Sequence, residues 1–438
     1  MDKSVENEII ESLRGLVRIE SVESKALKGM PFGKGVNDAL CYFLDLAKGF
    51  GLRTKNYGGY AGEVTLPAPN SESGKKKGAK DGIAALVHLD VVPAQADGWT
   101  EPPFSGNVRG GRMYGRGTTD DKGAAVVCLY ALKRLLDEGA RLSKDVKLIA
   151  GCDEESGQLC MKHYKKHAVM PETGFSPDAD FPVINCEKTI LQLKLRICAD
   201  KAFTALVNNI ECGNRANVVP DRAEARLTDG SALKFRGRAA HSMVAGEGDN
   251  AAHKLVGALR DKAEKGESAA LDFLADYLCD TDGKALGINA KDRKSGALTL
   301  NFASLNFTQK DGAHCEAVLD LRCPLSVKVE TVIKAVNAHM PKGSKVEILH
   351  HQPGLYVSPQ SKLVKTLLSS YEKATGKKGG CVISGGGTYA RQLKNGVAFG
   401  PSEKNTDNNI HSADEFIEIK QLGVMYETYY DAIKELAK

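Results

Sequence analysis

Side chains able to bind a metal or move a proton gather at a few points of the chain. His88 and Asp90 lie two residues apart in VHLD, so on a strand they point to the same face. An imidazole beside a carboxylate is typical of a metal ligand whose ring is held in place by a neighbour. The same pair also fits an ordinary ion pair at a half-exposed strand end, so HxD alone does not decide between the two.

Two acidic groups follow. Asp120 and Asp121 are adjacent in GRGTTDDKG at the expected start of a helix, where acids also act as simple caps. Asp153, Glu154 and Glu155 follow an apolar strand in CDEESG, and three like charges repel one another unless cations or solvent relieve them. Each group alone is compatible with a surface role.

The order of these groups along the chain is more specific than any one of them. Asp178 lies in SPD, and His411 lies far away in HSADE. The succession HLD, DDK, EE, SPD and HSADE resembles the M20 family of metallopeptidases, in particular its dipeptidase V-like branch, over essentially the whole chain. The stretches GWTEPPFSG, FPVINCEK, GGGTYAR and NGVAFGP are similar to the same branch.

The resemblance implies a centre of two divalent metal ions. It implies five ligands: His88, Asp120, Glu155, Asp178 and His411. Asp120 would bridge the two ions, Glu154 would be the general base, and Asp90 would orient His88. Imidazole and carboxylate ligands suit Zn²⁺, the first expectation, and also Mn²⁺ or Co²⁺.

The glycine-rich stretch GGGTYAR raises a separate question of what it binds. A phosphate loop is disfavoured, because no lysine follows the glycines in GKS/T form and no strand–GxGxxG–helix unit surrounds them. By the resemblance, the loop would bind the free carboxylate of a short peptide. Its expected substrate-binding residues are Gly385, Gly386, Gly387, Thr388 and Arg391.

Three residues of the central part of the chain complete the expected site. His241 in GRAAHS is similar to a lid histidine that donates to the oxyanion, and Arg322 in LDLRCP would be a second carboxylate clamp. Asn217 in RANVVPD is similar to a substrate-contacting asparagine, although an ordinary turn fits it equally well. The sequence after His241, SMVAGEGDNAA, lacks a proline common in relatives, which predicts a differently shaped loop.

The helices and strands that must position these residues are predicted to form an α/β domain with an insertion. Helices are expected near residues 9–17 and 36–50, and strand–helix–strand alternation between residues 82 and 155 predicts a mainly parallel twisted sheet flanked by helices. From about residue 188 the segments alternate polar and apolar residues, as in a sheet wet on one face. We therefore expect a catalytic domain in two parts, 1–187 and 354–438, and an α+β lid domain at 188–353.

Composition narrows the class of protein. The 438 residues are 42% hydrophobic and 26% charged, and the 60 basic and 55 acidic residues leave a net charge of +5. Apart from Lys75–Lys77 the basic residues are dispersed, which argues against nucleic acid. Neither a signal peptide nor an apolar membrane-spanning run is visible, and eleven scattered cysteines without a CxxC pair favour reduced thiols. A cytoplasmic location is expected.

The leading hypothesis is a metal-dependent dipeptidase that hydrolyses short peptides with a free C-terminal carboxylate. The same family implies an alternative, an N-acyl-amino-acid deacylase, a desuccinylase or a carboxypeptidase, which the metal ligands do not separate. The partners would be small peptides, with no nucleic acid and no membrane. A monomer is favoured over a lid-mediated homodimer.

Overall fold

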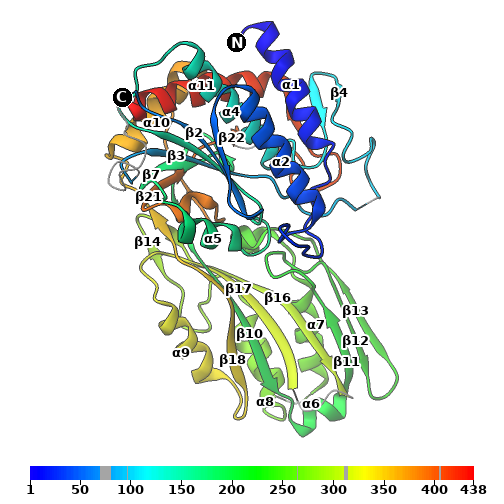
Figure 1. Cartoon of the computed structure of the whole chain (residues 1–438). Coiled ribbons are helices and arrows are strands. Elements are labelled where there is room, and N and C mark those ends of the chain that lie inside the picture. Colours follow the sequence, from blue (N-terminus) through cyan, green and yellow to red (C-terminus); the bar gives the residue numbers. More distant parts are fainter. Residues whose placement is uncertain (70–79, 96, 264, 310–313, 404–405) are drawn as a thin grey trace. The chain divides into compact units, whose positions relative to one another are not determined.

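The computed structural model describes residues 1–69, 80–95, 97–263, 265–309, 314–403 and 406–438. The expected loop tip at Lys75–Lys77 lies outside these residues. The chain forms two compact units (Figure 1). Unit 1 comprises Met1–Asn185, Val357–Val382 and Thr388–Lys438, and unit 2 comprises Cys186–Tyr356 and Ile383–Gly387.

Unit 1 contains a mixed sheet in the order β1-β2-β6-β3-β7-β21-β9. Its strands are β1 (Arg53–Asn56), β2 (Ala61–Leu66), β3 (Ile83–His88), β6 (Val146–Gly151), β7 (Thr173–Ser176), β9 (Val183–Glu187) and β21 (Asn395–Ala398). The central strands β6, β3, β7 and β21 are mutually parallel, and the pairings at both ends of the order are antiparallel. Strand β3 is buried at every position, as a central parallel strand requires.

Helices flank this sheet (Figure 1). They are α1 (Lys3–Val17), α2 (Lys34–Gly49), α4 (Lys122–Asp137), α5 (Leu159–His167), α10 (Lys362–Thr375), α11 (Ile419–Ala437) and the short η3 (Tyr389–Gln392). Helix α4 packs on β3 and β6, and α5 packs on β2. Shorter strands form two separate small sheets, one of β8 (Ala179–Asp180) and β22 (Pro401–Ser402), the other of β4 (Asn107–Arg109), β5 (Arg112–Tyr114) and β23 (Phe416–Glu418).

Unit 2 is built on an antiparallel sheet in the order β13-β12-β11-β16-β17-β10-β18. Its strands are β10 (Thr189–Cys198), β11 (Val207–Cys212), β12 (Arg222–Leu227), β13 (Ala232–Arg236), β16 (Thr299–Thr308), β17 (His314–Cys323) and β18 (Lys345–Gln352), with short β14 (Lys291–Asp292), β15 (Gly296–Ala297) and β19 (Leu355–Tyr356). The helices are α6 (Lys201–Leu206), η1 (Ser242–Glu247), α7 (Ala251–Lys262), α8 (Ala269–Leu278) and α9 (Val329–His339). Strand β20 (Cys381–Ser384) is divided between the two units.

The α/β class with an inserted α+β unit is confirmed, with one refinement. The unit 1 sheet is parallel only in its four central strands, because β1, β2 and β9 run antiparallel to their neighbours. The unit boundaries fall after Asn185 and after Tyr356, against the expected 187 and 353, and Ile383–Gly387 groups with unit 2. Among the described residues, no helix is both long and apolar enough to cross a bilayer. All eleven cysteines are free thiols.

Candidate metal centre

The expected ligands of unit 1 lie at the ends of neighbouring strands. His88 is the last residue of β3, while Glu155 and Asp178 follow β6 and β7. Because β6, β3 and β7 are parallel, their carboxyl ends meet at one edge of the sheet. Asp120 precedes helix α4, and His411 precedes β23 with a φ of 61°. Five ligands spread over more than 300 residues are thus brought to one place.

Asp120 lies between the two imidazoles. Its Oδ1 is 2.8 Å from Nε2 of His88, and its Oδ2 is 2.9 Å from Nε2 of His411. Nε2 of His88 is also 3.7 Å from Oδ1 of Asp178, and Nε2 of His411 is 3.1 Å from Oε1 of Glu155. One carboxylate shared between two histidine–carboxylate pairs has the arrangement of a bridging ligand.

Two groups of ligand atoms are compact enough to hold a cation. Atoms of His88, Asp120 and Glu155 lie within 4.8 Å of one another, and so do atoms of His88, Glu154 and Asp178. Glu154, expected as the base, is therefore close to the ligands. The donors are imidazole nitrogen and carboxylate oxygen, which suit Zn²⁺ and similar divalent ions.

Several acidic side chains of the cluster are buried close to one another. Burial, followed by the charge of Asp120, raises the pKa of Asp178 to about 7. Burial, then the charge of Asp178, raises the pKa of Glu154 well above its usual range. The pKa of His411 rises to about 11, because hydrogen bonds to Asp120 and Glu155 outweigh the opposing effect of burial. Buried carboxylates crowded in this way are stabilised by a cation, so the residues fit a metal centre.

Asp90 contacts both His88 and the backbone of Glu154 and Glu155. Nδ1 of His88 lies 2.9 Å from the backbone oxygen of Asp90 and 3.6 Å from its carboxylate Oδ1. The other carboxylate oxygen accepts hydrogen bonds from the backbone N–H groups of Glu154 (2.9 Å) and Glu155 (3.1 Å). Asp90 Oδ1 is buried without a hydrogen-bond partner among the described residues. Asp90 therefore fixes the backbone of the CDEE loop as well as facing His88.

Glu415 is a residue that the sequence analysis missed. Its carboxylate is fully buried, forms a 2.6 Å ion pair with Arg116 and accepts backbone hydrogen bonds from Gly117 (3.0 Å), Thr119 (3.0 Å) and Asp120 (3.3 Å). It thus ties the His411 segment to the loop that carries Asp120. The final glutamate of HSADE was the signal available in the sequence, but nothing in its spacing indicated burial.

The expected residues of unit 2 also come together, within that unit. Val218, next to Asn217, pairs with His241 in a β-bridge, and the backbone oxygen of Asn217 accepts from the N–H of Ser242 at 2.9 Å. Nδ1 of His241 accepts from the N–H of Met243 (3.1 Å), and the short helix η1 follows.

Arg322 is buried beside these residues. Its guanidinium donates to Asp320 (2.6 and 3.1 Å), to Ser242 Oγ (2.9 Å) and to the backbone oxygen of Gly385 (2.8 Å). Gly385 packs closely, since a Cβ there would lie 2.6 Å from Cβ of Met243. Arg322 therefore holds the first glycine of GGGTYAR.

From Thr388 onward that loop belongs to unit 1. Thr388 precedes η3, where its Oγ1 accepts from the N–H of Ala390 at 3.1 Å, and Arg391 lies within η3. Tyr389 is fully buried, and its hydroxyl lies 2.9 Å from Sγ of Cys160 on α5. The hydroxyl contact anchors this part of the loop to the element that follows the CDEE segment.

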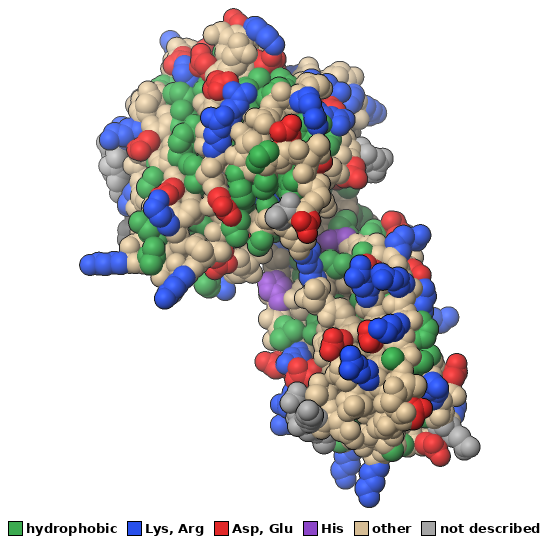
Figure 2. All heavy atoms as spheres, turned by 90° about the vertical axis from the view of Figure 1, so that its right-hand side faces the viewer, with side chains coloured by type: hydrophobic (Ala, Val, Ile, Leu, Met, Phe, Trp, Pro, Cys, Tyr) green, Lys and Arg blue, Asp and Glu red, His purple; other side chains and the backbone are tan. Residues whose placement is uncertain are grey.

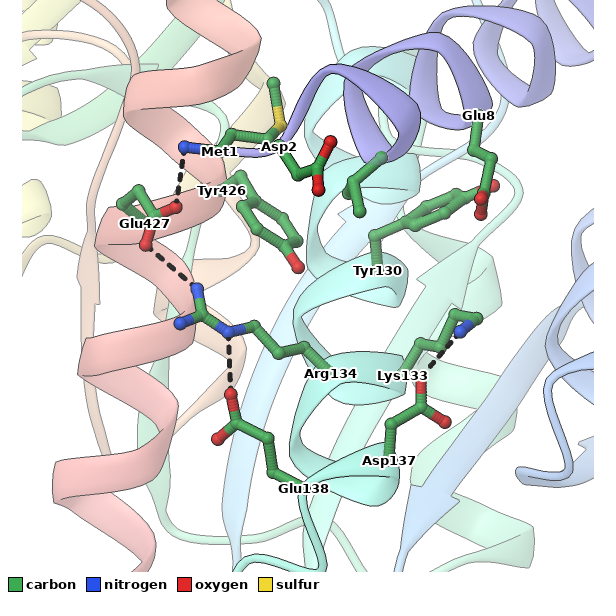
Figure 3. Close-up of a pocket in the computed structure, with 11 residues that line it drawn as sticks. Met1, Asp2, Glu8, Tyr130, Lys133, Arg134, Asp137, Glu138, Tyr426 and Glu427 are labelled. Carbon is green, nitrogen blue, oxygen red and sulfur yellow. Dashed lines mark hydrogen bonds and ion pairs between the residues drawn. The ribbon is translucent and has the colours of Figure 1, made fainter.

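A cavity of about 410 Å³ lies elsewhere in unit 1, where the start of α1 meets α4 and α11 (Figure 3). Arg134 lies between Glu427 and Glu138 and donates to both at 2.9 Å, while Lys133 pairs with Asp137. The basic side chains that line this cavity are thus paired with acidic side chains that also line it. On the face seen in Figure 2, acidic and basic side chains occur together on each unit.

The chain is similar to known proteins over almost its whole length. Residues 84–435 match the model of peptidase family M20/M25/M40. The chain is 38% identical to "Putative dipeptidase YtjP" of Bacillus subtilis, covering 98% of this chain and 97% of that protein. It is 32% identical to the Beta-Ala-Xaa dipeptidase of Lactobacillus delbrueckii, covering 98% and 96%.

Solved structures share the fold at lower identity. Human carnosine dipeptidase 1 superposes with a TM-score of 0.63 at 14% identity, covering 99% of this chain and 96% of that one. The M20 family metallo-carboxypeptidase Sso-CP2 from Sulfolobus solfataricus gives 0.62 at 18% identity, with full coverage of both chains. From the family model and the near full-length relatives above 30% identity, the chain belongs to peptidase family M20/M25/M40.

Proposed function

We propose that this protein is a metal-dependent dipeptidase acting on short peptides with a free C-terminal carboxylate. The observation that carries the proposal is the sharing of Asp120 between His88 and His411 at the carboxyl edge of the sheet. The names of the full-length relatives, which include a Beta-Ala-Xaa dipeptidase, support the choice of substrate class.

Two divalent ions would be held by His88 and Asp178 on one side and by Glu155 and His411 on the other, with Asp120 between them. When bound, such ions supply Lewis acidity that makes a water molecule nucleophilic near neutral pH. Zn²⁺ is the first candidate, and Mn²⁺ or Co²⁺ would suit the same donors.

Glu154 would take the proton of the attacking water and deliver it to the leaving amine. Its backbone N–H is held by Asp90, which also faces His88, so one carboxylate would align base and ligand. His241 would donate to the oxyanion of the tetrahedral intermediate.

Recognition of the substrate carboxylate is assigned to the GGGTYAR loop, through backbone N–H groups of Gly385–Gly387 and the side chains of Thr388 and Arg391. Arg322 would act there by holding the backbone of Gly385, with which it already bonds. Asn217, adjacent to the bridge with His241, would contact the peptide itself.

The proposal extends to location and assembly. The eleven free thiols suit a reducing compartment, so we place the protein in the cytoplasm. We propose a monomer, with a homodimer through unit 2 as the competing state that light scattering would detect.

The test is hydrolysis of a panel of dipeptides, tripeptides and N-acyl-amino acids by protein loaded with Zn²⁺ or Mn²⁺. Dipeptides should be cleaved fastest, chelation should abolish turnover and metal should restore it. Glu154→Gln should bind metal yet lose turnover, whereas Glu172→Gln, at an exposed pair with Lys394, should behave as wild type. Preferred cleavage of N-acyl-amino acids would replace the dipeptidase proposal with a deacylase, and chelator-resistant turnover would refute a metal mechanism.

A further inference from the structure

A line of three hydrogen bonds runs from Glu154 to the protein surface within unit 1. Oε1 of Glu154 accepts from Nε2 of Gln158 at 3.0 Å. Oε1 of Gln158 accepts from Nε2 of Gln392 at 2.7 Å, and Oε1 of Gln392 accepts from Nζ of Lys165 at 2.9 Å. Two glutamine side chains thus connect a carboxylate of the metal cluster to an exposed lysine.

The local backbone is shaped to present this line. Gln158 precedes helix α5 with a φ of 55°, a left-handed conformation that non-glycine residues seldom adopt. Lys165 lies two turns further along the same helix, and Gln392 is the last residue of η3. Unusual backbone of this kind is often kept where a side chain must point in a particular direction.

The lysine end of the line gives it a direction. A lysine ammonium can only donate hydrogen bonds, so Gln392 must turn its oxygen toward Lys165 and its nitrogen toward Gln158. Gln158 must then turn its oxygen toward Gln392 and its nitrogen toward Glu154. If the Gln392 amide turned over, its nitrogen would face the lysine and two donors would meet, so Lys165 selects one orientation of both amides.

We propose that Gln158, Gln392 and Lys165 form an oriented hydrogen-bond line that positions the carboxylate of Glu154. The inference rests on the proposed role of Glu154 as general base. The line bonds one carboxylate oxygen, Oε1, and leaves Oε2 as the atom that takes the proton from water. Because Asp90 already holds the backbone N–H of Glu154, the line supplies the remaining constraint, on the side chain.

Substitutions of the two glutamines test the direction of the line. Gln158→Glu still accepts from Gln392 but cannot donate to Glu154, so kcat should fall about tenfold, the usual worth of a hydrogen bond to a charged group, with KM unchanged. Gln158→Gly removes the same donor, suits the positive φ and guards against misfolding. Gln392→Glu should give a similar fall, because its carboxylate attracts the Gln158 nitrogen and turns that amide over.

Lysine substitutions separate orientation from charge. Lys165→Arg keeps a donor and should behave as wild type, whereas Lys165→Glu should lower kcat about threefold, as expected for an exposed contact. Lys166→Glu is the matched control, with the same change of charge one residue along α5, and should leave kcat unchanged. Equal effects of Lys165→Glu and Lys166→Glu would overturn the proposal.

A readout independent of turnover is the ¹⁵N–¹H spectrum of glutamine side chains in metal-free protein. The Gln158 amide should give a signal shifted by its bond to Glu154, and that shift should disappear in Gln392→Glu and persist in Lys166→Glu. Retained turnover in Glu154→Gln would refute the role of Glu154 as general base, and chelator-resistant turnover would refute the proposed function itself. Loss of turnover in Glu154→Gln, with wild-type kcat in the Gln158 and Gln392 variants and a Gln158 signal that Gln392→Glu leaves in place, would refute the hydrogen-bond line alone.

Discussion

Replacing Glu415 by glutamine should both destabilise the protein and weaken the metal centre. The glutamine side chain has the same shape but keeps one acceptor oxygen. In the wild-type protein the N–H groups of Thr119 and Asp120 bond to Oε1 of Glu415 at 3.0 and 3.3 Å. If the glutamine oxygen stays with Arg116 and Gly117, the new NH₂ group faces these two N–H groups. Two buried donors then lose a charged acceptor.

The magnitude follows from the number of bonds lost. Hydrogen bonds to charged groups contribute roughly 1.5–3 kcal/mol each, so losing two, one of them long, should cost about 3 kcal/mol of unfolding free energy. The opposite amide orientation would leave Arg116 buried without its carboxylate, which costs about 3–5 kcal/mol. The first orientation displaces the backbone of Asp120, the residue shared by the two histidines, and the second disturbs the adjoining Arg116–Gly117 segment, so affinity for Zn²⁺ should fall as well.

The assay combines urea unfolding of the metal-free protein with competition for Zn²⁺ against a chromophoric chelator. Glu418→Gln is the matched control, because Glu418 lies three residues along the chain and makes half-exposed ion pairs with Lys420 and Arg112. Its substitution should cost under about 1 kcal/mol and leave Zn²⁺ affinity unchanged. If Glu415→Gln cost no more than Glu418→Gln, the inferred tie between the two ligand loops would be wrong.

Three further predictions concern stability. Glu63 is a nearly buried carboxylate bonded to Tyr164 and Lys147, and these partners lower its pKa below the ordinary 4.5 even though burial acts in the opposite direction. The stabilisation of the fold by ionised Glu63 is therefore fully present above about pH 4.5 and is lost as the pH falls through the lowered pKa. Glu63→Gln should reduce the free energy of unfolding, measured in urea, by about 2 kcal/mol at pH 7 and by measurably less at pH 3.5. Gly174→Ala should cost about 3 kcal/mol or prevent folding, because a Cβ would lie 1.9 Å from the backbone oxygen of Ala84 on the neighbouring strand; wild-type thermal stability would contradict the close packing. Zn²⁺ at a hundred times its Kd should add about 3 kcal/mol, seen in calorimetry as a rise in Tm that chelator reverses and Asp178→Asn diminishes.

Much of the architecture could be predicted from the amino-acid order, and the residues expected as ligands lie close together in the folded chain. Buried parallel strands are continuous apolar runs, so β3 and β6 were visible, and the ligands follow these strands directly. The succession of short motifs from His88 to His411 carried the family resemblance, which the comparisons confirm. The antiparallel direction of the outer strands was not visible, because the direction of a pairing depends on neighbours distant in the chain.

The tertiary structure alone decided which groups hold these ligands in place. Glu415 bonds the N–H of Asp120 across 295 positions of sequence, and Gln392 reaches Gln158 across 234. Glutamate and glutamine are common on protein surfaces, and nothing in the spacing of Glu415 or Gln392 distinguishes them. Only their burial and neighbours in the folded chain show that they contact the site. Likewise, only the folded chain shows that Arg322, expected as a clamp, is buried and bonded to Asp320 and Gly385. The order of the motifs can be read directly from the sequence. Hydrogen-bond partners, in contrast, depend on distances between residues that are set only when the chain folds.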